Sequence, residues 1–139
     1  MWGTCLGYEG INVILSEDYN NNLLQNFSNL NVKGNIIFKP GFEETSVLWH
    51  DLPKHLIQFA TDEAPFYYYH HFGVTPKRFR QNKAVNHLFS ISSYGQTANN
   101  GTLFVNSIEG RKGLPIYGTQ FHLEKSGFEW RKDINASHH

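Results

Sequence analysis

Apolar side chains recur at helical spacing in the segment Leu6–Leu15, and the polar run Ser16-Glu17-Asp18 closes the pattern. This spacing predicts a helix that begins directly after Cys5. Thr75 and Pro76 are typical of a second helix start, with the threonine as N-cap and the proline at the first helical position. The polar segment 77–86 would form that second helix.

Short runs rich in β-branched and aromatic residues, bounded by glycine, proline or asparagine, predict the strands. They cover residues 35–39, 56–60, 87–93, 102–108 and 114–122. Residues 20–35 are rich in asparagine and lack periodicity, which predicts a loop, whereas 46–56 is ambiguous because Pro53 limits any helix there. The aromatic run 66–69 is expected to lie mostly in the core. Mixed helices and strands without a linker predict one layered α/β domain over residues 1–139.

The composition excludes several classes of partner. The 139 residues include 12 basic and 12 acidic side chains, so no overall field attracts nucleic acid or anionic lipid. No apolar run reaches membrane-spanning length. Sequons for N-glycosylation begin at Asn26, Asn100 and Asn135. They matter only in a secretory compartment, and chance explains them equally well in a chain this rich in asparagine.

Cys5 is the only cysteine, so it forms no disulfide within the chain. Small residues lie on both sides of it, in Gly3-Thr4-Cys5-Leu6-Gly7, as a strained strand-to-helix turn requires. The N-terminus of the following helix would lower the pKa of the thiol. The backbone N–H of Leu6 is the expected first donor to an acyl oxyanion.

His122 and Glu124 are the expected partners of this nucleophile. An imidazole at a strand end could take the thiol proton and return it to a leaving amine, and a carboxylate two residues on could orient the ring. Each pattern also has a non-catalytic explanation. Small residues flank cysteines by chance, and a histidine at a strand end is more often structural.

His70 and His71 raise the question of a metal site. Neighbouring residues of a strand point to opposite faces, so the pair cannot easily hold one ion, and no zinc-ligand spacing is present. We therefore expect no metal site here, with one of the two histidines lining the site.

Several segments resemble the gamma-glutamyl hydrolases, which are folate-poly-gamma-glutamate hydrolases of the class I glutamine amidotransferase-like superfamily. They are Trp2-Gly3-Thr4-Cys5-Leu6-Gly7-Tyr8-Glu9, His70-His71-Phe72-Gly73-Val74-Thr75-Pro76, the segment 115–125 around Gln120-Phe121-His122-Leu123-Glu124, and Phe128-Glu129-Trp130.

The resemblance implies a three-layer α/β/α flavodoxin-like fold. It also implies that Cys5 is the nucleophile, His122 the acid/base and Glu124 the third member, with His70 on the glutamate-binding side. The implied substrate is a folylpolyglutamate, cleaved through a thioester acyl-enzyme without metal or cofactor. The implied location is lysosomal, vacuolar or extracellular, and a homodimer is a further possibility.

Two departures from the family pattern lead to expectations about the structure. Leu123 replaces the usual proline between His122 and Glu124, so a looser pair is expected. The chain also begins at the elbow, where the residues before the turn are too few for the strand that should carry it. We therefore expect a domain incomplete at both ends, with unpaired sheet edges. A class I glutamine amidotransferase domain and a non-catalytic truncated remnant of the fold remain alternatives.

Overall fold

The computed structural model describes residues 1–18 and 22–124. The sequon at Asn135 and the segment Phe128–Trp130 lie outside these residues. The helices are α1 (Leu6–Leu15), α2 (Phe42–Thr45), α3 (Lys54–Asp62), α4 (Pro76–Gln81) and α5 (Lys83–Leu88), with a short 3-10 turn η1 at Arg111–Gly113. The strands are β1 (Trp2–Thr4), β2 (Leu24–Gly34), β3 (Ile37–Phe38), β4 (Phe66–Val74), β5 (Phe89–Gln96), β6 (Leu103–Gly110) and β7 (Tyr117–Thr119).

Two sheets organise the described residues. The larger sheet has the strand order β1-β7-β6-β5-β3, and β2 and β4 form a separate two-stranded antiparallel sheet. In the larger sheet only β1 and β7 run parallel, whereas β7–β6, β6–β5 and β5–β3 are antiparallel. The predicted α/β class is confirmed. The larger sheet of the described residues is mixed.

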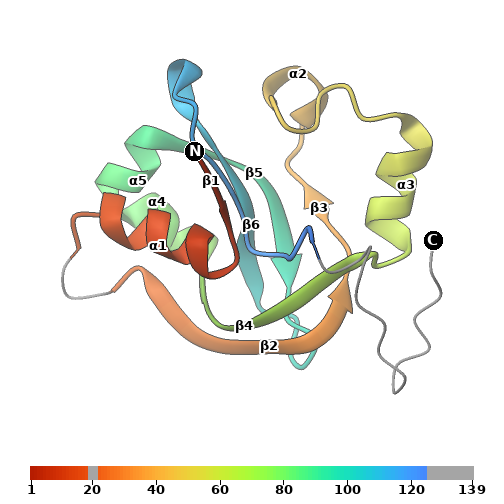
Figure 1. Cartoon of the computed structure of the whole chain (residues 1–139), viewed down its shortest axis with the longest axis horizontal. Coiled ribbons are helices and arrows are strands. Elements are labelled where there is room, and N and C mark those ends of the chain that lie inside the picture. The colour runs from red at the N-terminus through yellow and green to blue at the C-terminus, as the bar shows by residue number, and fades with distance from the viewer. Residues whose placement is uncertain (19–21, 125–139) are drawn as a thin grey trace.

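Helices cover both sides of the larger sheet (Figure 1). On one side α1, α4 and α5 bury an apolar cluster that includes Tyr8, Phe79 and Ile108. On the other side, toward α2 and α3, a smaller cluster joins Tyr68 of β4 to Phe104 and Phe121. The β2–β4 ribbon runs across one end of the sheet (Figure 1). Burial of large apolar side chains on both faces is the main term that stabilises this layering.

The structure confirms the helix at Leu6–Leu15 and the cap at Thr75, whose side chain accepts a hydrogen bond from the Arg78 N–H. The single helix predicted over 77–86 is wrong, because the chain turns extended at Asn82 (φ −81°, ψ 107°). The Asn82 side chain then caps α5 by accepting from the Val85 N–H. The strand predicted from residue 87 accordingly begins only at Phe89.

Two further segments differ from their predictions. The loop expected over 20–35 contains the long strand β2, because its backbone groups pair with β4 despite two register irregularities. The strand expected over 56–60 is the helix α3, which starts directly after Pro53 and buries only Ala60. A short apolar run does not distinguish a helix from a strand, so the packing of the segment in the fold determines which one forms.

β1 corrects the expectation that the chain is too short to form the strand before the elbow. Its three residues pair in parallel with β7, with Trp2 opposite Tyr117 and Thr4 opposite Thr119. β1 is one of the two edge strands of the larger sheet as described. Among the described residues, every helix is too short or too polar to reach across a lipid bilayer.

Candidate active site

Cys5 occupies a strained turn between β1 and α1. Its backbone has φ 50° and ψ −107°, a conformation that residues with a side chain rarely adopt. The Cys5 N–H donates to the Thr119 carbonyl at 2.8 Å, and the Cys5 carbonyl accepts from the Glu9 N–H at 3.0 Å. The first bond ties the turn to the end of β7, and the second starts the helix. This is the geometry of a nucleophile elbow.

The two glycines that flank Cys5 are not equivalent. A Cβ added to Gly3 would lie 2.7 Å from the backbone of Gly7, because α1 folds back closely over β1. A Cβ added to Gly7 would meet nothing within 4 Å. The steric requirement for a small residue therefore lies before the cysteine and not after it.

The thiol of Cys5 is largely enclosed, with 8% of the residue exposed. Its Sγ lies 3.4 Å from the Tyr69 carbonyl oxygen of β4, to which it can donate. Burial raises the pKa of the Cys5 thiol, and the Glu9 carboxylate adds to this, whereas a hydrogen bond from the Leu6 backbone lowers it. The predicted lowering by the helix N-terminus is thus outweighed by burial and by Glu9.

His122 lies beside β4 as well. Its backbone N–H donates to the Tyr67 carbonyl at 2.9 Å, as an isolated antiparallel bridge beyond the end of β7. The Nδ1 atom of its ring lies 2.6 Å from Glu124 Oε1. The side chain of His122 is mostly covered, and that of Glu124 is exposed. With Leu123 between them, the two side chains still reach each other without the proline.

Cys5 and His122 both contact the free edge of β4. Tyr67 and Tyr69 are two residues apart on one strand, so their carbonyls point the same way, roughly 7 Å apart along the strand. One carbonyl accepts from His122 and the other lies against the Cys5 thiol. Two residues that lie 117 positions apart in the sequence therefore contact the same short stretch of β4.

Glu9 and Gln120 belong to the same site, although the sequence analysis did not select them as site residues. Gln120 Nε2 donates to Glu9 Oε1 at 3.0 Å, and the Gln120 side chain also forms a hydrogen bond with the Cys5 thiol. Only 8% of Glu9 is exposed, and this burial raises the pKa of its carboxyl group. One signal could have found Glu9, because a residue four positions after Cys5 lies one helical turn above it.

His70 and His71 have different surroundings, as expected for neighbours on a strand. His70 is 3% exposed, packs against the rings of Phe27, Tyr68 and Phe104, and its Nδ1 lies 2.8 Å from the Phe72 carbonyl. Burial lowers the pKa of His70 to about 4, so its ring is neutral near pH 7. His71 is exposed, and its charge lowers the pKa of the Glu9 carboxyl group. The side chain of His71 therefore lies near Glu9, whereas His70 belongs to the aromatic cluster.

The aromatic run of β4 is divided in the same way. Tyr68 is buried, but 50% of Tyr69 is exposed, so the expectation that the run lies mostly in the core is wrong for Tyr69. The ring centroid of Tyr67 is 6.0 Å from that of His122. Tyr67, Tyr69 and His71 alternate with the buried residues along β4 and form the row next to His122, Cys5 and Glu9. Within residues 1–18 and 22–124, no group of three or more metal-ligating side chains comes together.

No family model matches the chain. Curated proteins do: it is 33% identical to the gamma-glutamyl hydrolase of Rattus norvegicus and 30% identical to that of Mus musculus, each over 99% of this chain and 41% of the relative. It is also 28% identical to gamma-glutamyl hydrolase 1 of Arabidopsis thaliana, over 94% of this chain and 36% of that protein.

An elbow cysteine and a histidine that contact the same strand of an α/β fold are typical of hydrolases and acyl-transfer enzymes. The comparisons indicate one kind of hydrolase, since the chain is similar in sequence to the gamma-glutamyl hydrolases. It spans about two fifths of the length of the curated relatives that it matches.

Proposed function

We propose that the chain carries the reacting residues of a hydrolase that cleaves gamma-glutamyl bonds. The observation that carries this proposal is the joint attachment of Cys5 and His122 to the edge of β4, at carbonyls two residues apart. The names of the relatives supply the bond type, and the resemblance described above supplies folylpoly-gamma-glutamate as the substrate.

In the proposed reaction His122 takes the proton of the Cys5 thiol, and the sulfur attacks the gamma-carbonyl carbon of the substrate. The carbonyl electron pair moves to oxygen, where the backbone N–H of Leu6 donates to the oxyanion. The oxyanion collapses, the C–N bond breaks, and His122 returns the proton to the leaving amine. Water, deprotonated by His122, then hydrolyses the thioester and releases the gamma-glutamyl acid and the free thiol. Glu124, at 2.6 Å from Nδ1, would hold the ring and leave Nε2 as the nitrogen that exchanges the proton.

The experiment compares the purified chain with its Cys5→Ser and His122→Asn variants on a pteroyl-gamma-glutamate oligomer, with products separated by chromatography. We expect either substitution to reduce kcat by about a thousandfold or more. His55→Asn removes an exposed histidine from α3 and is the matched control, with unchanged kcat. Equal cleavage by the wild type and the Cys5 variant, or no cleavage by the wild type, would contradict the proposal.

The raised pKa of the Cys5 thiol favours a second candidate, a domain that keeps the fold without the activity. The thiolate is the form that attacks a substrate, and a raised pKa lowers the fraction of Cys5 in that form near neutral pH. Alkylation by iodoacetamide separates the two. A reaction of Cys5 slower than that of free cysteine at every pH, together with no substrate turnover, would support the non-catalytic domain.

The proposal also includes the particular α/β fold and the cellular location of the protein. The parallel pairing of β1 with β7, and the helices on both sides of the sheet, support a part of a three-layer flavodoxin-like domain. A lysosomal, vacuolar or extracellular location is supported by the exposure of Asn26 and Asn100, which begin two of the sequons. Expression through a secretory pathway, followed by treatment with an N-glycosidase, tests this directly. A protein of unchanged mass would contradict it.

A further inference from the structure

A cavity lies away from Cys5. It has a volume of about 460 Å³ and is bounded by the segment around α2, the start of β5 and the end of β6. Since β6 is antiparallel to β7, its end at Glu109 pairs with Tyr117, at the start of β7. Cys5, in contrast, follows the end of β1 next to Thr119. The cavity and the elbow therefore lie toward opposite ends of these strands.

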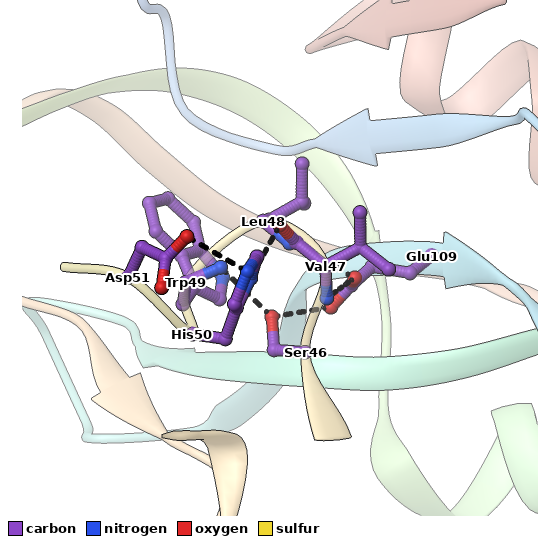
Figure 2. A network of polar contacts seen from close by, with 7 residues as sticks. All are labelled: Ser46, Val47, Leu48, Trp49, His50, Asp51 and Glu109. Carbon is purple, nitrogen blue, oxygen red and sulfur yellow. Dashed lines mark hydrogen bonds and ion pairs between the residues drawn. The ribbon is translucent and has the colours of Figure 1, made fainter. Parts of the chain in front are cut away.

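One wall of this cavity is fixed by the carboxylate of Glu109, which is 3% exposed. Its Oε2 accepts from the Ser46 hydroxyl at 2.6 Å, and its Oε1 accepts from the backbone N–H groups of Val47 and Leu48 at 2.6 and 3.1 Å. Figure 2 shows these bonds converging on Glu109 from the turn that follows α2. Both oxygens are thus occupied by donors of the protein. The turn is held in place, and the cavity is formed before any ligand binds.

The charged side chains that line the cavity are mostly cationic. Lys39 enters from the segment before α2, and Arg111 and Lys112 follow the end of β6. Within the described residues none of these three forms an ion pair. Arg111 is positioned by a bond from its Nε to the Asn86 carbonyl at 3.0 Å. The cavity therefore has a local excess of positive charge, although the whole chain has no net charge.

The remaining lining is suited to an apolar group. Phe42 and Ile91 are buried residues that line the cavity, and the Phe42 ring is stacked on Phe38 with 4.4 Å between centroids. A volume of this size lies in the range of small-molecule sites. These three cations do not form the extended basic groove that a nucleic acid would need.

We propose that this cavity binds a small organic anion. Its phosphate or carboxylate group would meet Lys39, Arg111 and Lys112, and its apolar body would lie against Phe42 and Ile91. Charged hydrogen bonds to the cations would supply the specificity for the anion, because the Glu109 carboxylate is already satisfied by Ser46 and the backbone. The site is independent of the reaction proposed at Cys5.

The test is a titration of the whole chain with phenyl phosphate, followed by NMR of the backbone amides. We expect saturable shifts at Val47, Lys112 and Gly113, weaker binding of inorganic phosphate, and weaker binding at high salt. The double variant K39Q/K112Q removes two charges but keeps the aliphatic stems, and should weaken binding by about tenfold or more.

The matched control is K54Q/K77Q, which removes two exposed lysines that do not line the cavity and should bind like the wild type. Three outcomes would overturn the proposal. They are the absence of saturable binding up to about 10 mM phenyl phosphate, equal losses in the two double variants, and shifts confined to the surroundings of Cys5 and His122. The amide spectrum also reports whether each variant is folded.

Discussion

Two buried carboxylates, Glu9 and Glu109, show how differently the two ends of the sheet use the same side chain. Glu109 accepts three hydrogen bonds and fixes a turn. Among the described residues, the Glu9 carboxylate accepts one, from Gln120. Glu9 also lies next to the thiol of Cys5, and burial raises its pKa. The carboxylate surrounded by donors stabilises the local structure, whereas the one with a single donor has a raised pKa and raises that of the neighbouring thiol.

The largest expected effect is on stability, at Glu109. Glu109→Ala would leave the Ser46 hydroxyl and the amides of Val47 and Leu48 without their acceptor. We expect the free energy of unfolding to fall by about 3 kcal/mol, as measured by urea denaturation. Glu9→Ala is the matched change and should cost clearly less, since one bond is lost. A larger loss at Glu9 would reverse the roles that we assign to the two residues.

A pH dependence of comparable size is expected from His70. Its folded pKa of about 4 lies below the ordinary value of 6.5, so between these values the unfolded chain binds more protons. The contribution of His70 to stability is therefore complete above about pH 6.5 and is lost as pH falls toward 4, by up to about 3 kcal/mol.

Urea denaturation at pH 4 and pH 7 would measure this. His70→Asn keeps a donor for the Phe72 carbonyl but does not titrate, so it should lose this part of the pH dependence whatever its own stability. The same slope in the wild type and the variant would show that His70 is not buried in the neutral form.

The glycines around Cys5 give an effect of intermediate size. Gly3→Ala places a Cβ against the backbone of Gly7 and should destabilise the chain by about 2 kcal/mol. Gly7→Ala has open space inside a helix and should stabilise it by about 0.5–1 kcal/mol. Thermal unfolding of the pair checks this. Losses of equal size would mean that both glycines are required by the elbow.

The smallest effect on stability, but a direct one on chemistry, is expected for Glu9→Gln. Removing the carboxylate charge removes one of the causes that raise the pKa of Cys5. Alkylation of Cys5 by iodoacetamide should become faster at a given pH, with its profile moved to lower pH. Glu17→Gln, a change of the same type at an exposed residue just beyond α1, is the control. An unchanged alkylation profile for Glu9→Gln would remove Glu9 from the electrostatics of the site.

The prediction of the fold from the sequence succeeded where the signal is local. The helix Leu6–Leu15 and the Thr75 cap follow from spacing and from capping chemistry within a few residues. It failed for β2 and α3. The asparagine-rich β2 is a strand because β4 supplies its hydrogen-bond partners, and the apolar run in α3 fits either structure.

The residues of the candidate site also fall into those that the sequence could predict and those that depend on the fold. Cys5 and His122 could be chosen from residue type and spacing, because few side chains can act as nucleophile or proton carrier. Gln120, Tyr67 and Tyr69 could not, since their relation to the thiol depends on where the edge of β4 lies in the fold. The choice between His70 and His71 likewise needed the orientation of the strand.

The sequence by itself determined the helix after Cys5, the candidate reacting side chains, and the likeness to gamma-glutamyl hydrolases. The tertiary structure decided which groups surround the thiol, and with them the direction in which its pKa moves. The physical reason is that propensity and capping act over a few residues, whereas burial and charge at a site depend on segments that meet only in the folded chain.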